Sequence, residues 1–299
     1  MTLGFIGLGK MGQQMVGRLI EAGHHVVVLD VNPEALRAAV QLGAEAATDR
    51  SDLLRQLGAE AVVWLMIPSA AVDAELQQLA ASLPHDSVVI DGGNSDFRQT
   101  VARSKKLAER GATLVDVGTS GGILGLKDGF SLMIGGPEDV VKRLDPLFVA
   151  LAPPGGYRYF GPSGAGHFIK MVHNAVEYGL MESYAEGYRL LREGPYADLD
   201  LAVVGQVWEH GSIVASRLNQ LASQVLAVDP ELEESNGVAN ESGEAGWALE
   251  VASARGIDMP ALKAAHEVRV ASQSGQVSFA TRLLAALRHA FGGHEVPKL

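Results

Sequence analysis

The first half of the chain alternates short apolar runs with amphipathic segments, and this alternation restricts the fold more than any other feature of the sequence. Several of the apolar runs lack alternating polar positions, which is typical of strands in a sheet covered on both faces. Strands that alternate with helices predict an α/β domain built on a doubly wound parallel sheet. The predicted strands are Leu3–Ile6, Val26–Leu29, Ala61–Ile67, Ser87–Ile90, Thr113–Val117 and Ser131–Ile134. The predicted helices between the early strands are Met11–Ala22, Pro33–Leu42, Ser51–Leu57, Val72–Leu83 and Phe97–Arg110.

The second half of the chain has a different pattern. Beyond Gly161-Pro162-Ser163-Gly164 the strand-like runs stop, and helical periodicity continues almost to His289. The turn-rich stretch Leu151–Gly156 precedes this change and indicates a connector. A chain of 299 residues is long enough for two domains with separate cores. We therefore predict a Rossmann-type dinucleotide-binding domain over 1–162 and an all-helical domain over 163–299.

A glycine motif follows the first predicted strand. Gly7-Leu8-Gly9-Lys10-Met11-Gly12 fits the spacing G-x-G-x-x-G and opens the first predicted helix. The first glycine would form the tight turn, the second would admit a pyrophosphate, and the third would allow close packing of helix on strand. The amides at the helix N-terminus would bind the phosphates. The alternative is a glycine turn that binds no ligand.

Asp30 ends the second predicted strand, about 20 residues beyond the glycines, where a carboxylate binds a ribose 2′-hydroxyl. The same carboxylate repels a 2′-phosphate, and Val31 follows where a basic residue would favour NADP. We therefore predict NAD as the cofactor. The competing interpretation is that Asp30 only caps the turn that follows it.

A polar stripe runs along the predicted helix Gly164–Glu193, which is otherwise largely apolar. At about 100° per residue the stripe spans an arc of roughly 140°. A polar face on an apolar helix favours the lining of a cleft, where an amine and a carboxylate can act as base and acid. The alternative is a solvated face with Lys–Glu pairing, although the lysine and the glutamate are too far apart for a close pair. The stripe consists of Lys170, His173, Asn174, Glu177 and Tyr178.

Two glycine-rich loops follow strands that should end at the same edge of the sheet. Asp91–Ser95 follows one strand, and Gly118–Gly122 follows the next. Ligands of open α/β sheets bind at the carboxyl ends of the strands, so both loops should face the cleft. Ser120 with the amides of Gly121 and Gly122 could form a small nest for a carboxylate.

Composition excludes several classes of function. The formal net charge is −11, which argues against nucleic acid or an anionic membrane as a partner. The chain has no cysteine, which removes a disulfide framework, a thiolate nucleophile and a cysteine-bound metal. The N-terminus lacks the pattern of a signal peptide, and apolar stretches such as Ala61–Pro68 are too short to span a bilayer. We expect a cytoplasmic protein whose anionic ligands are bound by local positive groups.

These residues resemble the β-hydroxyacid dehydrogenases, and within them the 6-phosphogluconate dehydrogenase branch. The cofactor signature Gly4–Gly12 is similar to that of the whole family. Relatives that act on 3-hydroxyisobutyrate typically carry Asn-Asn after the lysine rather than His-Asn. The segments that carry the closer resemblance are Gly92–Ser95, Ser120–Gly122 with Ser131–Gly136, Gly166–Tyr178 and Arg288–His294.

The resemblance implies NAD-dependent oxidative decarboxylation of 6-phosphogluconate. Lys170 would be the general base at the C3 hydroxyl. Glu177 would be the acid that protonates C1 of the enediol, which forms when CO₂ leaves. No metal would be needed, because the ketone accepts the electron pair. The implied cofactor residues are Gly7, Leu8, Gly9, Lys10, Met11, Gly12, Asp30 and Asn94. The implied substrate residues are Asn94, Ser120, Gly121, Gly122, His173, Asn174, Tyr178, Arg269, Arg288 and His294.

The resemblance further implies a homo-oligomer, because in the family the C-terminal segment reaches the active site of a neighbouring subunit. The chain resembles the short class and not the longer relatives with a duplicated helical domain. One position departs from the family pattern: Gly246 stands before Trp247, where a basic residue usually helps to bind phosphate. A second hypothesis is therefore a β-hydroxyacid dehydrogenase that does not decarboxylate. A third, from another class, is a nucleotide-sensing protein without turnover.

Overall fold

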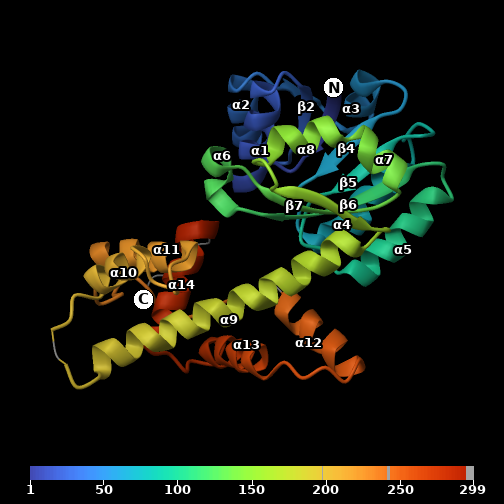
Figure 1. The fold of residues 1–299 in the computed structure, drawn as a ribbon. Helices are drawn as coiled ribbons and strands as arrows, with labels where there is room; N and C mark the ends of the chain where they lie inside the picture. Colours follow the sequence, from blue (N-terminus) through green and yellow to red (C-terminus); the bar gives the residue numbers. More distant parts are fainter. Residues whose placement is uncertain (197, 241–242, 294–299) are drawn as a thin grey trace. The chain divides into compact units, whose positions relative to one another are not determined.

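The computed structural model describes residues 1–196, 198–240 and 243–293 of the chain. The chain divides into two compact units, Met1–Met171 and Val172–Leu299. The long helix α9, Ala165–Glu193, begins in the first unit and continues into the second (Figure 1).

The first unit is built on one eight-stranded sheet with the order β3-β2-β1-β4-β5-β6-β7-β8. All neighbouring strands are parallel except β6 and β7, which pair antiparallel from Asp116 opposite Gly135 to Ser120 opposite Ser131. The α/β prediction is thus confirmed, with one antiparallel pair that the sequence pattern did not indicate. The strands are β1 Thr2–Ile6, β2 His25–Leu29, β3 Glu45–Ala46, β4 Val62–Leu65, β5 Val88–Asp91, β6 Thr113–Ser120, β7 Ser131–Gly135 and β8 Tyr157–Gly161.

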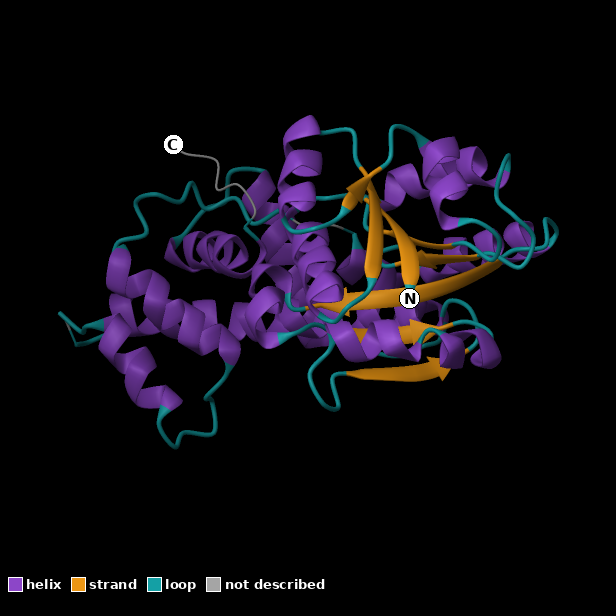
Figure 2. Cartoon of the chain, turned by 90° about the horizontal axis from the view of Figure 1, so that it is seen from above, coloured by secondary structure: helices purple, strands orange, loops and turns teal. Residues whose placement is uncertain are grey.

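Helices cover both faces of this sheet, as the uninterrupted apolar strands require (Figures 1 and 2). One apolar cluster joins the sheet to α1, α7 and α8, and a second joins the other face to α3, α4 and α5. The helices are α1 Lys10–Glu21, α2 Pro33–Gln41, α3 Arg50–Leu57, α4 Ser69–Ala80, α5 Phe97–Ala108, the 3-10 turn η1 Gly122–Leu124, α6 Gly125–Asp128, α7 Glu138–Arg143 and α8 Asp145–Leu151.

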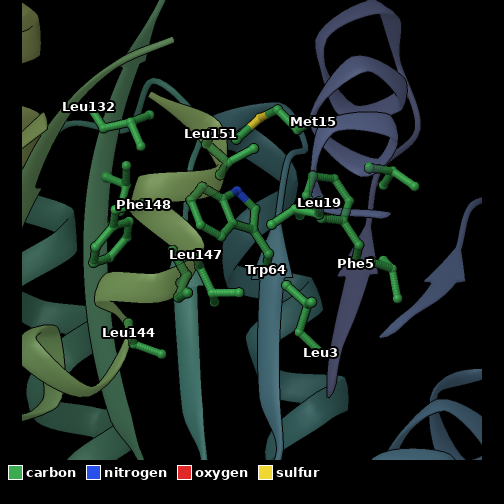
Figure 3. Packing of buried hydrophobic residues seen from close by; sticks show 14 of the residues in the cluster. Leu3, Phe5, Met15, Leu19, Trp64, Leu132, Leu144, Leu147, Phe148 and Leu151 are labelled. Atoms are coloured by element: carbon green, nitrogen blue, oxygen red, sulfur yellow. The ribbon is translucent and has the colours of Figure 1, made fainter. Parts of the chain in front are cut away.

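Trp64 of β4 lies at the centre of the first cluster (Figure 3). Its ring stacks on Phe5 of β1 with centroids 6.2 Å apart, and Phe148 of α8 meets it edge-on at 6.4 Å. All three side chains are almost completely buried. The aromatic packing therefore fixes β1 and β4, the two strands next to the glycine motif, against the helical layer.

Two strands and several element ends differ from the sequence-based prediction. The strands β3 and β8 were missed: β3 has only two residues, and β8 is an edge strand in which exposed and half-buried residues alternate. β6 runs to Ser120, three residues beyond the predicted end, because its last residues pair with β7. Helix α4 begins directly after Pro68, three residues earlier than predicted.

In the described residues of the second unit, helices joined by loops are the regular secondary structure, and no strand is present (Figure 2). Its core joins the C-terminal part of α9 to α10, α11 and α14, with Tyr188 and Leu284 fully buried. Three helices begin at side-chain caps, namely Asp200, Ser216 and the capping box of Ser278 with Thr281. The helices after α9 are α10 Leu201–Glu209, α11 Arg217–Val228, α12 Glu244–Ala254, α13 Pro260–Gln273 and α14 Phe279–Gly292.

Candidate active site

The glycine motif forms the turn between β1 and α1. Gly7 has a φ of +102°, and a Cβ there would lie 2.3 Å from the carbonyl oxygen of Met66. Gly9 is the N-cap of α1, and nothing lies within 4 Å of the position that its Cβ would take. The first turn of α1 contains no acidic residue. The turn therefore leaves open space beside helix amides, which fits a bound pyrophosphate.

The remaining residues of the motif support this turn. Leu8 is buried, Lys10 is exposed as the first residue of α1, and Met11 is half-buried against the first core cluster. Gly12 packs so closely on the turn that a Cβ would lie 2.1 Å from the carbonyl oxygen of Gly7. The predicted strand–turn–helix context of the motif is confirmed.

Asp30 lies directly beyond β2 and accepts two backbone hydrogen bonds. The amide of Leu8 donates to one carboxylate oxygen, and the amide of Asn32 donates to the other over 2.7 Å. Asp30 therefore caps the turn that follows β2, as the competing interpretation predicted. A carboxylate has further lone pairs, so Asp30 can hold the glycine turn and still accept from a ribose hydroxyl.

The loops after β5 and β6 lie at the same edge of the sheet, because the two strands pair in parallel with Asp91 opposite Asp116. Asn94 is exposed in the first loop. Ser120 is half-buried at the end of β6, and Gly121 and Gly122 follow with positive φ of 131° and 56°. This conformation turns the backbone away from the strand, as an amide nest requires.

Lys170 is 5% exposed and belongs to the first turns of α9. The helix lies so close to β6 that a Cβ at Gly118 would be 2.4 Å from Cβ of Lys170. Gly118 therefore permits the helix to approach the strand that ends at Ser120. Within the first unit, the structure brings Lys170 to the strand end that carries the serine–glycine loop.

A buried polar network that sequence reasoning missed fixes the start of α9. Asp116 is fully buried and accepts hydrogen bonds from the amides of Gly164 at 2.7 Å and His167 at 2.9 Å. The His167 ring contacts the Thr100 hydroxyl at 2.7 Å and the Asp91 carbonyl oxygen at 3.2 Å. The available signal was a single aspartate within the apolar run Thr113–Val117.

The same network reaches the loop that carries Asn94. The carboxylate of Asp91 accepts from the Ser95 hydroxyl at 2.7 Å and from the Gly93 amide at 3.2 Å. Arg103 is 3% exposed and donates to Ser95 at 3.2 Å. The loop after β5 and the start of α9 are therefore held by one set of buried hydrogen bonds.

In the second unit, α9 carries the next part of the predicted stripe. The His173 ring nitrogen Nδ1 lies 3.0 Å from Oδ1 of Asn174 and 3.9 Å from a carboxylate oxygen of Glu177. Asn174 is 8% exposed and donates to Oε1 of Glu244, the first residue of α12, over 3.1 Å. Glu177 is half-buried. Glu244 is 2% exposed and was not predicted from the sequence.

Arg269 of α13 is completely buried against this stretch of α9. Its guanidinium lies 3.6 Å from the centroid of the Tyr178 ring, and Nη2 contacts the Met181 sulfur at 3.3 Å. Burial lowers the pKa of Arg269 to about 10, and the positive charge of Arg288 contributes in the same direction. Two cations that repel each other in a buried setting favour the binding of an anion.

Four buried charged atoms in this unit have no hydrogen-bond partner among the residues that the structure describes. They are Nε of Arg269, Nη1 of Arg288, Oε2 of Glu182 and Oε2 of Glu244. Buried polar groups are normally satisfied, so this concentration indicates a place for a polar ligand. The predicted substrate residues Tyr178, Arg269 and Arg288 meet here.

Glu182 is the second acidic residue that the sequence did not single out. It is 7% exposed on α9, and burial raises the pKa of its carboxyl to about 7, with Glu186 acting in the same direction and Arg269 against it. No sequence signal distinguishes it from the solvated glutamates farther along the helix.

The predicted contribution of His294 lies outside the described residues. Gly246 of α12 is half-buried, and the nearest atom to the position of its Cβ is Nε2 of His266 at 3.7 Å. Among the described residues, no group of three His, Asp or Glu is arranged to bind a metal. No helix in the described part of the chain has both the length and the apolar character to cross a membrane.

The fold and the two family models that match the chain agree with each other. A mostly parallel sheet with a glycine turn at its switch point is typical of a dinucleotide-binding unit. Residues 2–161 match the NAD binding domain of 6-phosphogluconate dehydrogenase, and residues 166–286 match the C-terminal domain of 6-phosphogluconate dehydrogenase. The chain belongs to the 6-phosphogluconate dehydrogenase family, as its resemblance predicted.

Two of the similar proteins align over the whole chain, and a third aligns over three quarters of it. It is 41% identical to the NAD(+)-dependent, decarboxylating 6-phosphogluconate dehydrogenase of Haloferax volcanii, over 100% of this chain and 99% of that protein. It is 35% identical to a putative 6-phosphogluconate dehydrogenase of Bacillus subtilis over the full length of both. Another relative of Bacillus subtilis, named NAD(+)-dependent and decarboxylating, is 33% identical over 75% of this chain and 50% of its own length.

Solved structures share the fold. The 6-phosphogluconate dehydrogenase of Plasmodium falciparum is 25% identical with a TM-score of 0.77, over 96% of this chain and 70% of that one. A 3-hydroxyisobutyrate dehydrogenase of Salmonella typhimurium is 21% identical with a TM-score of 0.76, over 94% and 98% of the two chains. The second likeness describes the fold alone.

Proposed function

We propose that the protein oxidises and decarboxylates 6-phosphogluconate to ribulose 5-phosphate and CO₂, with NAD as the hydride acceptor. The observation that carries the proposal is the helix α9, which presents Lys170, His173, Asn174, Glu177 and Tyr178 in the order that the family resemblance requires. The name of the Haloferax volcanii relative, which aligns over the whole chain, supports the decarboxylating reaction.

Lys170 acts as the base in this mechanism. It takes the proton of the C3 hydroxyl as the C3–H bond breaks. NAD held at the glycine turn would supply the oxidising power for this step as the hydride acceptor. The product of this step is a 3-keto acid. Its C1–C2 bond then breaks, CO₂ leaves, and the electron pair moves into the carbonyl, which the protonated Lys170 polarises. The buried setting of Lys170 beside Gly118 excludes water from this proton transfer.

Glu177 completes the reaction as the acid. It gives a proton to C1 of the enediol, which becomes ribulose 5-phosphate. His173 and Asn174 orient the substrate hydroxyls with Asn94, which also contacts the cofactor. Ser120, Gly121 and Gly122 bind the carboxylate that is lost as CO₂. This division of roles follows the family resemblance and the positions of these residues on α9 and at the strand ends.

The phosphate end of the substrate binds to the second unit. Arg269 and Arg288 have buried nitrogens without a partner in the described chain, and Tyr178 stacks on Arg269. Arginine suits this role because its planar group binds phosphate with two parallel hydrogen bonds. We propose that His294 adds to this site from a neighbouring subunit of a homo-oligomer. Residues 1–162 then serve the cofactor, and residues 163–299 serve the substrate and assembly in the cytoplasm.

The cofactor prediction can be measured directly. The protein should have a kcat/KM that is at least about tenfold higher with NAD than with NADP. The reason is that the carboxylate of Asp30 accepts a hydrogen bond from a 2′-hydroxyl and repels a 2′-phosphate. Steady-state kinetics with both cofactors at saturating substrate measure this ratio. A clear preference for NADP would overturn the assignment of Asp30.

The residue before Trp247 favours a second candidate function. Gly246 stands where the family usually has a basic residue, so one phosphate contact is absent from this position. The alternative is a β-hydroxyacid dehydrogenase that acts on another small hydroxy acid without decarboxylation. Comparing kcat/KM for 6-phosphogluconate, gluconate and 3-hydroxyisobutyrate separates the two. The proposal requires 6-phosphogluconate to exceed gluconate by about a hundredfold or more, the contribution of a well-bound charged group.

A further inference from the structure

The phosphate-binding cluster of the second unit contains a carboxylate that none of the proposed steps uses. Glu182 is 7% exposed, and its Oε2 has no hydrogen-bond partner among the described residues. A buried carboxylate without a partner is costly, so its presence requires an explanation.

The position of Glu182 on α9 directs it toward the arginine cluster. Residues three and four apart share a helix face, so Glu182 lies on the face of Tyr178. Tyr178 stacks on Arg269, and the neighbouring Met181 contacts Nη2 of the same arginine. Arg269 and Glu182 interact electrostatically, although neither Nε of Arg269 nor Oε2 of Glu182 is hydrogen-bonded in the described chain.

We propose that Glu182 is a specificity-determining residue that couples the binding of a phosphate-bearing substrate at Arg269 to the uptake of a proton. The inference rests on the proposed function, because it takes Arg269 as a ligand of the substrate phosphate. An ionised Glu182 and a phosphate compete for the same buried positive charge and repel each other. A protonated Glu182 leaves the charge of Arg269 and Arg288 to the phosphate.

The charged groups around Glu182 act on its carboxyl in opposite directions. Glu186 on α9 repels the Glu182 carboxylate, whereas Arg269 of α13 attracts it, and Glu177 and Arg288 act on Arg269. Burial raises the pKa of Glu182 to about 7, so the carboxyl of the free protein titrates in the neutral range. A bound phosphate adds negative charge and raises this pKa further, which means that binding above pH 7 must take up a proton.

The experiment measures binding of 6-phosphogluconate to the full-length chain by calorimetry without NAD, so that no turnover occurs. Titrations between pH 6 and 8.5, in buffers of different ionisation enthalpy, give both Kd and the number of protons taken up. For the native chain we expect about half a proton or more at pH 7.5, and a Kd that rises by up to about tenfold per pH unit above 7.

Glu182→Gln keeps the shape of the side chain and removes its charge, so the pH-dependent rise of Kd and the proton uptake should both fall sharply. Glu193→Gln is the matched control, because this exposed glutamate at the end of α9 pairs with Arg189 and is not among the charges that act on Glu182, so its loss should leave the coupling in place. Gluconate, which has no phosphate, should bind with no difference between the native chain and Glu182→Gln.

Three results would overturn the inference, and one of them would also overturn the proposed function. If the native chain binds 6-phosphogluconate without proton uptake, or if Glu182→Gln retains the full uptake, the inference fails and the proposed function stands. If 6-phosphogluconate does not bind at any pH in the range, both fail. Proton uptake by the native chain is measured without any substitution. This measurement therefore tests the inference even if Glu182→Gln does not fold.

Discussion

Replacing Lys170 with methionine is expected to lower turnover of 6-phosphogluconate by about 10²–10⁴-fold, the usual contribution of a positioned acid or base. Methionine keeps an unbranched side chain in the close contact between α9 and Gly118, so the helix should remain in place. The loss should appear in hydride transfer itself, because removal of the hydroxyl proton accompanies that step. Single-turnover formation of NADH, followed by its absorbance, measures it.

The control for this variant is Lys105→Met, which removes an exposed lysine from α5 in the same unit. It should keep near-normal turnover, and both variants should keep the affinity for NAD of the native chain. Near-normal hydride transfer in Lys170→Met would show that the base is another group.

The second large effect is expected for Glu177→Gln. Steady-state turnover should fall by about 10²–10³-fold, because the amide cannot give a proton to C1 of the enediol. Hydride transfer and loss of CO₂ precede this step and should survive. A rapid burst of about one NADH per site, followed by slow turnover, is the expected kinetic pattern in stopped-flow absorbance.

Glu193→Gln serves as the control, since this exposed glutamate ends the same helix and pairs only with Arg189 among the contacts described. Its NADH formation in stopped-flow absorbance should match that of the native chain. A Glu177→Gln enzyme whose burst is slowed as strongly as its steady state would place Glu177 in hydride transfer, in conflict with its assigned role.

The sequence predicted those parts of the fold that local patterns encode. The glycine motif, the uninterrupted apolar strands and the long helix through Lys170 each have a recognisable pattern in the sequence, and the structure contains all three. The strand β8 was missed because an edge strand with exposed positions lacks the uninterrupted apolar signal of its neighbours. β7 was predicted as a strand, but its antiparallel pairing with β6 was not, because the residues of a strand do not determine the direction in which it pairs.

The candidate site was predicted less completely, because burial of a polar side chain depends on distant segments. Asp116 holds α9 through amides some fifty residues away in the chain. Glu182 is buried and is acted on by Arg269 of α13, whereas Glu186, one turn farther along α9, is exposed. Such residues become recognisable only when the fold brings their neighbours together.

The most direct test of the proposed function is a single assay of the full-length chain with 6-phosphogluconate and NAD, in which NADH and CO₂ are followed together. Oxidative decarboxylation predicts equal amounts of NADH and CO₂ throughout the reaction. Formation of NADH without CO₂ would contradict the decarboxylating mechanism and favour the alternative hydroxyacid dehydrogenase. Absence of both products would contradict the assignment of 6-phosphogluconate as the substrate.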